Sequence, residues 1–458
     1  MVSLADELQD IDLGDQRLNR RARRLLEKLG KNPAASIPTA CGGWKEVKAA
    51  YRLLSNEKVD GQKILEPHYI CTEERMRKEA VVLCIQDTTE LDYTGKSDIE
   101  GLGPLNYEAR KGLYLHPTLA VTPDRVCLGI LDAWEFKREP GSLGKARNAS
   151  RAIEEKESLR WLEGYQRTCE RQQEMPGTQL ISVADREGDM YDIFHERETL
   201  LQQGKLAADW LVRFRADRNT VDGGKLRSVV EKSAVIGYVE FDLPVGKGRK
   251  KRHVIQSLRV AEVDLNPPRR TGEKFVSVKI TALLASEDSP PDGEEAVEWL
   301  LLSSVKVATA ERAEEMLQWY LARWQVEIFF RILKSGCKVE ELQLEKGERI
   351  EAALSLYMIV AWRILFLVTI GRECPELPCN VVFDDDEWKA ACIVSRRKII
   401  PDKPPTMNEM IRMVAGFGGF IGRKGDGFPG PQTLWIGLQR VQDFSLAIQS
   451  QKEMGSEL

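Results

Sequence analysis

The stretch QWYLARWQVEIFFRILKSGCK, residues Gln318–Lys338, has the apolar spacing of a long helix. Its apolar side chains recur at steps of three and four, which predicts a stripe that faces the core, formed by Leu317, Leu321, Trp324, Ile328 and Ile332. A helix turns by about 100° per residue, so a second set shares a face within roughly 60°. This second set consists of Tyr320, Arg323, Glu327 and Lys334.

Two interpretations of that second face stay open from the helix alone. Arg323 and Glu327 are four positions apart, and such pairs also occur on ordinary solvated helices. The alternative is a catalytic helix that presents one hydroxyl, two cations and one carboxylate. Two acidic residues upstream, each directly after an apolar strand, favour the second interpretation.

The bulk composition is that of a globular protein with several domains. The chain has 458 residues, of which 42% are apolar and 30% charged, with a formal net charge of −4 and a pI of about 5.9. This balance argues mildly against a surface coated in positive charge. It does not exclude a nucleic-acid-binding protein, because local basic patches form the contact surface.

Nine scattered cysteines without a CxxC pair predict neither a disulfide framework nor a zinc site. The polar, acidic start carries no cleavable signal, so we expect a cytoplasmic protein.

The apolar segment Ala352–Gly371 approaches the length of a membrane span. Arg363 lies in its middle, where a charge in lipid is costly, so we expect a buried helix and no contact with a membrane.

The N-terminal region predicts a small helical DNA-binding unit. Residues 12–31 form a basic amphipathic helix with Asp15 as its N-cap. Further helices are expected at Trp44–Leu54 and Val59–Glu79. Arginines cluster on the first helix and suit a phosphate backbone, with Arg17 and Arg21 as candidate contacts, although a solvated charged helix is the alternative.

The middle of the chain alternates strands and helices. Val81–Ile85 predicts a buried strand that ends just before Asp87, and Leu180–Ala184 predicts another that ends at Asp185. Between them we expect a hairpin over residues 112–136 with its turn at Thr122–Arg125, and a helix at Glu154–Gln173; a helix at Met190–Gln202 follows. This order is that of ribonuclease-H-like folds.

An aspartate after a strand is often only a cap or turn residue. Two aspartates at matching strand ends, together with Glu327 on a later helix, are stronger evidence for a shared site. The strand-like segments of residues 210–296 predict an all-β insertion with basic loops at Lys247–Arg252 and Arg269–Lys274. The segment EAVEWLLLSSV, residues 295–305, predicts a strand that returns to the main sheet.

The predicted fold class is therefore α/β, a ribonuclease-H-like mixed sheet with an all-β insertion, flanked by helical N- and C-terminal domains. We expect boundaries that give residues 1–70 to DNA binding, 71–371 to catalysis with the insertion at about 210–296, and 372–458 to dimerisation. The glycine-rich run at residues 416–431 separates two amphipathic helices, whose apolar stripes suggest self-association.

Three carboxylates and no Ser-His-Asp or Cys-His arrangement point to metal-ion chemistry. The four histidines are not paired at ligand spacing, and oxygen ligands favour Mg²⁺ or Mn²⁺ over zinc. Two ions about 4 Å apart can assist both the attacking and the leaving oxygen of a phosphoryl transfer. The expected ligands are Asp87, Asp185 and Glu327.

The pattern Tyr-x2-Arg-x3-Glu-x6-Lys resembles the YREK signature of bacterial insertion-sequence DDE transposases, in the transposon-five branch. The likeness extends along most of the chain, through LGDQR, AAYR, QDTT, DRE, EWLLLSS and FGGF. It implies that Asp87, Asp185 and Glu327 are the DDE triad. It also implies a cut-and-paste reaction on terminal inverted repeats, with a hairpin intermediate, joining to target DNA, and a synaptic homodimer that acts in trans.

The resemblance also assigns DNA contacts. Trp299 matches an aromatic residue that stacks on a flipped base, Tyr320, Arg323 and Lys334 match residues that grip phosphates, and Arg213 matches a DNA-contacting arginine. Tyr191 departs from the family, because a histidine is expected there. Two alternatives stay open: a ribonuclease-H-like nuclease without strand transfer, and a non-catalytic DNA-binding remnant or inhibitor of transposition.

Overall fold

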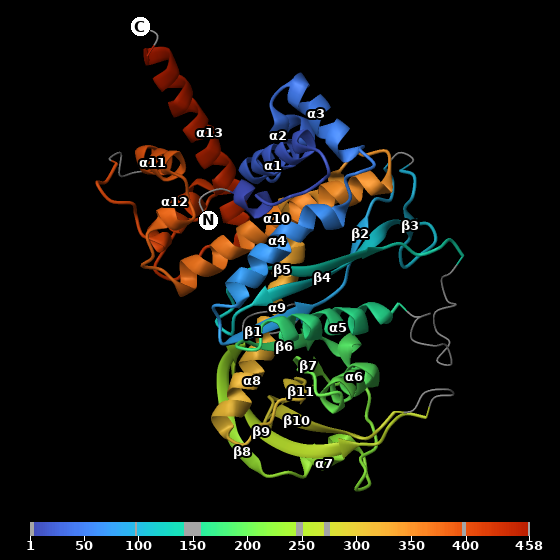
Figure 1. Ribbon diagram of the computed structural model, residues 1–458. Helices are drawn as coiled ribbons and strands as arrows, with labels where there is room; N and C mark the ends of the chain where they lie inside the picture. Colours follow the sequence, from blue (N-terminus) through green and yellow to red (C-terminus); the bar gives the residue numbers. More distant parts are fainter. Residues whose placement is uncertain are drawn as a thin grey trace.

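The computed structural model describes residues 4–96, 99–141, 157–243, 251–269, 275–395 and 400–456. Among these residues one mixed sheet of 11 strands runs through the middle of the protein, in the order β2-β4-β1-β6-β7-β11-β10-β9-β8, with β3 and β5 also paired to β4 (Figure 1). Helical regions precede and follow it, so the predicted fold class is confirmed. The strands are β1 Val81–Gln86, β2 Thr89–Asp92, β3 Gly103–Pro104, β4 Lys111–Val121, β5 Cys127–Phe136, β6 Gln179–Ala184, β7 Asp209–Arg213, β8 Val235–Leu243, β9 Arg252–Leu265, β10 Val278–Glu287 and β11 Glu298–Ser303.

The sheet separates two apolar cores, because successive side chains of a strand point to opposite faces. In β1, Leu83 and Ile85 belong to one core, and Val82 and Cys84 to the other. Helices α5 and α6 lie against the second core, and α4, α8, α9 and α10 against the first. A central strand buried on both faces reads as a continuous apolar run, which is why β1 and β6 were predictable.

The helices of the N-terminal region agree with the predicted ones. Asp15 caps α1 by accepting a hydrogen bond from the backbone N–H of Arg17, and the apolar side of α1 is buried. The helix α2, which was not predicted, is capped by Ser36 and ends at Gly42 in the left-handed conformation. The elements are η1 Leu4–Leu8, α1 Gln16–Lys31, α2 Ile37–Cys41, α3 Trp44–Leu54 and α4 Gly61–Met76.

The remaining helices are α5 Leu159–Glu174, η4 Arg186–Gly188, α6 Tyr191–Gln202, α7 Leu226–Glu231, α8 Ala310–Ala322, α9 Trp324–Arg331, η5 Ile332–Gly336, η6 Val339–Glu341, α10 Gly347–Glu373, η7 Cys379–Val381, α11 Asp385–Val394, α12 Met407–Phe417 and α13 Pro431–Ser456. Helix α10 is the one described helix that is long and apolar enough to cross a membrane, and 89% of its most apolar window is buried inside the protein. It is the core helix that the sequence predicts.

The predicted all-β insertion needs two corrections. Strand β7 pairs in parallel with β6, so it belongs to the central sheet and not to the insertion. The insertion also contains the helix α7, and its strands β8, β9 and β10 extend the same sheet beyond β11. The reason is that β11 pairs on both sides, with β7 and with β10, so no edge separates the insertion from the sheet. Most of the two basic loops lies outside the described residues.

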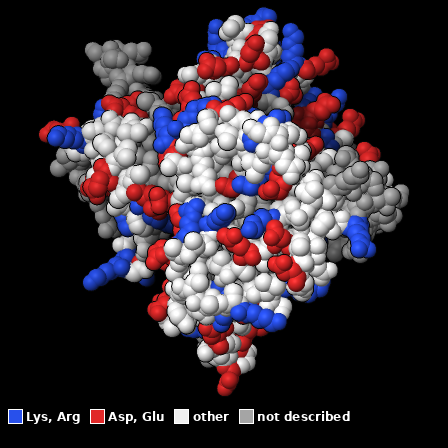
Figure 2. Space-filling view, turned by 60° about the horizontal axis from the view of Figure 1, so that its bottom comes forward, with Lys and Arg blue, Asp and Glu red and all other residues white. Residues whose placement is uncertain are grey.

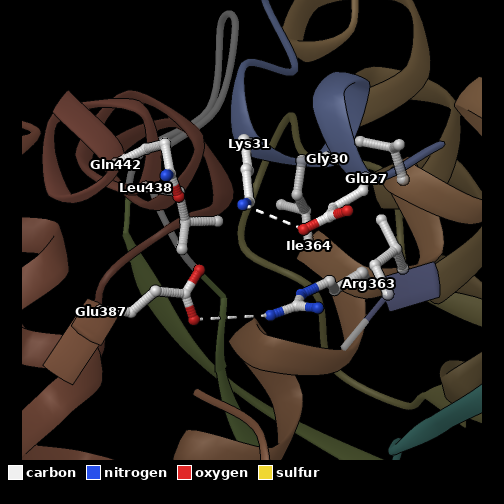
Figure 3. A pocket seen from close by; sticks show the side chains of 10 residues that line it. Glu27, Gly30, Lys31, Arg363, Ile364, Glu387, Leu438 and Gln442 are labelled. Atoms are coloured by element: carbon white, nitrogen blue, oxygen red, sulfur yellow. Dashed lines mark ion pairs between the residues drawn. The ribbon is translucent and has the colours of Figure 1, made fainter. Parts of the chain in front are cut away.

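A small pocket marks the place where the two helical ends meet. Helices α1, α10, α11 and α13 line it (Figure 3). Arg363, the charge in the middle of α10, donates a hydrogen bond to the backbone oxygen of Val382 and lies 3.9 Å from the Glu387 carboxylate. A buried helix thus carries an arginine because that arginine reaches polar partners on the C-terminal region.

Candidate active site

Asp87 and Asp185 lie side by side at one edge of the sheet. Strands β1 and β6 are parallel, with Ile85 opposite Val183, so the residues two positions further on occupy equivalent places. The carboxyl ends of parallel strands form the same edge, which is why two aspartates 98 positions apart in the sequence come together. The structure therefore brings these two predicted residues to one site.

Arg213 and Trp299 reach the same edge. In the pairing of β6 with β7, Ala184 lies opposite Val212, so Arg213 follows at the level of Asp185. Strand β11 is antiparallel to β7, with Leu301 opposite Arg213, so the start of β11 and Trp299 lie near this edge. The ring of Trp299 is half-buried and stacks on Phe241 of β8, with ring centroids 6.0 Å apart and planes 19° apart.

The third predicted carboxylate, Glu327, lies on α9, which directly follows α8. Arg323 stands at their junction and donates a hydrogen bond of 2.7 Å to Oδ2 of Asp87. Its other terminal nitrogen lies 3.5 Å from Oε1 of Glu327. One guanidinium thus bridges two of the three predicted carboxylates, and Asp185 contributes to the same electrostatic environment.

The charge balance of this site is unfavourable for a bare carboxylate. Burial raises the pKa of Asp87 to about 7, Arg323 and the N–H of Thr88 oppose that shift, and the carboxylates of Asp185 and Glu327 add to it. Burial also raises the pKa of the Tyr320 phenol, against the effect of the Arg323 and Arg213 cations. A bound cation would relieve the repulsion among the acidic groups.

The predicted ligands are all carboxylate oxygens, the type of atom that ions such as Mg²⁺ prefer as ligands. Within the described residues, however, no group of three His, Cys, Asp or Glu side chains is placed to hold one ion together. The Arg323 guanidinium instead supplies the positive charge between Asp87 and Glu327. Asp87, Asp185 and Glu327 would be the residues that hold divalent ions, and the ions would supply charge for phosphoryl transfer.

The apolar stripe predicted for the helix over Gln318–Lys338 is wrong at Trp324, because this residue is 62% exposed. Leu317 and Ile332 of the predicted stripe are buried as expected, and Val326, Phe329 and Phe330 of α9 also face the first core. Trp324 shares the open face with Glu327, and the Arg323 guanidinium lies 5.9 Å from its ring centroid. Trp324 is exposed because the face of α9 that carries it, beside the carboxylate edge, is not covered by another of the described elements.

The regular α-helix also ends before Lys334, at Arg331. Residues Ile332–Gly336 form a π-helical turn, closed by a 2.8 Å hydrogen bond from the N–H of Cys337 to the oxygen of Ile332. This turn changes the angular spacing on which the predicted alignment of Lys334 with Glu327 rests. The Lys334 ammonium lies 4.0 Å from Glu340, and Glu340 also accepts the N–H of Asp92.

The predicted arginines of α1 lie on the N-terminal unit, apart from the carboxylate edge. Arg17 has an 81% exposed side chain that pairs with its own helix cap, Asp15. Arg21 lines a shallow hollow with Arg24 and Lys28, next to α3. At the start of α3, Trp44 is 77% exposed. These are accessible groups of the kind that contact a nucleic-acid backbone.

Positive charge is gathered in small groups. On the face shown in Figure 2, Lys and Arg side chains alternate with Asp and Glu side chains between broad uncharged areas. This distribution agrees with the slightly negative net charge of −4. DNA contact is therefore expected from local groups such as the arginines near the carboxylate edge.

Sequence reasoning missed a buried polar group beneath the carboxylate edge. His116 of β4 contacts Thr88 at 2.8 Å and Gln86 at 3.2 Å, and Gln86 donates to Ser182 at 2.9 Å. Burial holds the pKa of His116 well below its usual range. Thr88 follows Asp87 directly, and its position in QDTT was the only sequence signal.

Tyr191, the departure from the family, donates a 2.7 Å hydrogen bond to the oxygen of Val276.

Three family models match the chain. Residues 3–59 match a model described as Transposase DNA-binding. Residues 184–363 match the Transposase DDE domain, and residues 359–454 match the Transposase Tn5 dimerisation domain. Asp185 and Glu327 fall inside the second range, whereas Asp87 precedes it. Helices α1 to α3 fall in the first range and α11 to α13 in the third.

Proposed function

The chain belongs to the DDE transposases of the Tn5 type, metal-dependent enzymes that cut and join DNA, and from this premise we propose how its own residues do so. The chain binds DNA and forms a homodimer. We assign the catalytic triad to Asp87, Asp185 and Glu327. The observation that carries this assignment is the equivalent placing of the two aspartates on β1 and β6, with Arg323 between Asp87 and Glu327.

The three carboxylates would hold two Mg²⁺ or Mn²⁺ ions, which would polarise the scissile phosphate and its attacking oxygen. Arg323 lies between Asp87 and Glu327 and contacts both carboxylates, at 2.7 Å and 3.5 Å. With the carboxylates engaged in holding ions, the Arg323 guanidinium would donate to a DNA phosphate beside them. Tyr320 and Arg213, on the same edge, would donate to further phosphate oxygens.

The reaction is proposed to pass through a hairpin at the transposon end. The triad carboxylates first position water against one strand, and the freed 3′-OH then attacks the opposite strand. Trp299 would stack on a base flipped out at the hairpin, and Phe241 already packs against its ring. A second water would then hydrolyse the hairpin and regenerate the 3′-OH, which finally attacks a phosphodiester of target DNA and joins the transposon end to it. Lys334 would contact a further phosphate; its ammonium lies 4.0 Å from Glu340 and makes only a long ion pair with that carboxylate.

The partners are proposed to be terminal inverted repeats, target DNA and a second copy of the chain in a synaptic complex. Arg17 and Arg21 would position the duplex on the N-terminal unit without reading its sequence. We propose domain limits near residues 70 and 371. The second limit falls at the end of α10, whereas the first falls inside α4, which packs on both α10 and β5.

Two other functions make different predictions. A ribonuclease-H-like nuclease without strand transfer would cut the DNA but form neither hairpins nor joined products. A catalytically inactive remnant or inhibitor would bind the ends and leave them intact. The presence of all three carboxylates at or beside one edge favours the transposase over the inactive protein.

The test is a cleavage assay with purified wild type and Glu327→Ala on DNA that carries the inverted repeats flanking the gene. Hairpinned ends with Mg²⁺ and wild type only would support both the reaction and the carboxylate. Cleavage by Glu327→Ala at the wild-type rate would refute the triad. Cleavage without hairpins or joining would identify the plain nuclease, and binding without cleavage the inactive protein.

A further inference from the structure

A second arginine, Arg160, is buried close to the two aspartates. It lies in the first turn of α5, and its side chain is only 9% exposed. Its Nε donates a 3.0 Å hydrogen bond to Oγ1 of Thr88, and a terminal nitrogen lies 3.5 Å from Oε2 of Glu187. The other terminal nitrogen donates to the backbone oxygen of Glu157 at 2.7 Å. The same guanidinium therefore contacts two different turns of the chain.

Each of these two turns belongs to one aspartate. The backbone N–H of Thr88 donates to Oδ1 of Asp87 at 2.8 Å. The backbone N–H of Glu187 donates to Oδ1 of Asp185 at 2.7 Å. Arg160 thus holds the side chain of each residue whose N–H orients a carboxylate. The two contacts differ in kind, because Thr88 accepts a 3.0 Å hydrogen bond whereas Glu187 pairs with Arg160 at 3.5 Å through a side chain that is 55% exposed.

The Thr88 hydroxyl is held from its other side by His116. The carboxamide oxygen of Gln86 can only accept, so Nε2 of His116 donates to it. Nδ1 of this neutral ring then accepts the hydroxyl proton of Thr88, which leaves the Thr88 oxygen to accept from Arg160. This assignment gives one donor and one acceptor to each of the contacts Arg160–Thr88, Thr88–His116 and His116–Gln86. The position of the Arg160 guanidinium is therefore determined by strands β1 and β4 as well as by α5.

We propose that Arg160 is a positioning residue, which links the turn after Asp87 to the turn after Asp185 and so sets the separation of the two carboxylates. This inference rests on the proposed function, in which these carboxylates hold the metal ions. Groups that orient metal ligands typically change metal affinity or activity by about 10- to 100-fold when they are removed. A guanidinium suits this role because its planar fork can donate in two directions at once.

The direct test measures metal binding by the full-length protein without DNA. Free Mn²⁺ is quantified by electron paramagnetic resonance during titration of wild type, Arg160→Met and Thr88→Val. We expect Arg160→Met to raise the Kd for Mn²⁺ by about 10-fold or more. Thr88→Val removes only the bridging hydroxyl, and we expect a rise of roughly 3-fold or more. It also keeps the proposal testable if Arg160→Met does not fold.

The matched control is Arg197→Met. Arg197 of α6 has a 20% exposed side chain that pairs at 3.0 Å with Asp209, at the opposite end of β7. Both methionine variants are expected to lower the melting temperature, but Arg197→Met should leave the Kd for Mn²⁺ within about 2-fold of wild type. A merely structural arginine at position 160 would behave like this control.

Asp185→Asn distinguishes this proposal from the one on which it rests. If Asp185→Asn weakens Mn²⁺ binding but folded Arg160→Met and Thr88→Val bind Mn²⁺ like wild type, the role of Arg160 is refuted and the triad survives. If Asp185→Asn leaves Mn²⁺ binding unchanged, the triad assignment fails, and the role of Arg160 fails with it. Weaker binding in all three variants, with Arg197→Met unaffected, supports both.

Discussion

Arg323 and Asp87 are separated by 236 positions in the chain, yet the guanidinium of the first donates a 2.7 Å hydrogen bond to the carboxylate of the second. The pair joins the junction of α8 and α9 to the end of β1. The Arg323 guanidinium therefore lies between carboxylates that are proposed to hold the metal ions of the reaction. This relationship, the Trp299 ring at the same edge and the buried Glu7 carboxylate of the N-terminal region lead to four predictions.

Arg323→Gln is expected to bind Mn²⁺ more tightly than wild type in the absence of DNA, by roughly 3-fold or more, because a competing positive charge is removed from Asp87 and Glu327. The same variant should cleave DNA at least about 10-fold more slowly, because the charged contact to phosphate is lost. Titration with Mn²⁺ at pH 8 and single-turnover cleavage measure the two effects. Weaker Mn²⁺ binding by the variant would show that Arg323 orients the carboxylates and does not compete with the metal.

Asp87→Asn is expected to stabilise the metal-free protein at pH 8 while abolishing cleavage. Burial raises the pKa of Asp87 from 3.8 to about 7, so its contribution to stability falls as pH rises through this range and is fully lost above it. The variant should therefore melt at a higher temperature than wild type at pH 8, with a smaller gain at pH 5. A gain of equal size at both pH values would show that titration of Asp87 is not its cause.

Trp299→Ala is expected to slow hairpin formation by about 10-fold, since base–aromatic stacking contributes about 1–3 kcal/mol per base. First-strand nicking should change by less than about 2-fold, because it needs no flipped base. Both steps are followed in one reaction on labelled end DNA. Phe241→Leu, which keeps the Trp299 ring but removes the ring that stacks on it, should have a weaker effect of the same kind. Equal slowing of nicking and hairpin formation by Trp299→Ala would rule out the stacking role.

Glu7→Gln is expected to lower the melting temperature, because it leaves Arg75 without its buried carboxylate. Burial alone would raise the pKa of Glu7, but His68 and Arg75 together lower it to about 2. The stability from Glu7 is therefore present above pH 4.5 and is lost as pH falls toward 2. Loss of one partner of a buried pair costs about 3–5 kcal/mol at neutral pH.

The control for this prediction is Glu27→Gln, which breaks a 3.0 Å pair with Lys31 whose side chains are 42% and 36% exposed. We expect it to change the free energy of unfolding by less than about 1 kcal/mol. Thermal melts of both variants between pH 3 and pH 7 give the comparison. If Glu7→Gln has no larger effect than this control at pH 7, the buried contact between η1 and α4 does not stabilise the fold.

Local patterns in the sequence predicted much of the fold. The apolar runs of β1 and β6 indicate strands buried on both faces, and Asp15 marks the start of α1. The hairpin of β4 and β5 and the buried helix α10 are confirmed as well. These features depend on neighbouring residues and on the side of an element that meets the core. The triad assignment stays a prediction, although two of its members lie side by side.

Most strands and helices, and the acidic residues that follow two of the strands, could be predicted from short segments, because periodicity and capping are local properties. The helices α2 and α7 and the π-turn at Ile332–Gly336 could not. Tertiary contacts were needed to show that β7 joins the central sheet, that Trp324 lies on an open face, and that Arg160 contacts the turns after both aspartates. These outcomes depend on strand pairing and on contacts between distant residues. No local spacing encodes which buried cation meets which turn, because that choice is made only when the sheet and its helices pack together.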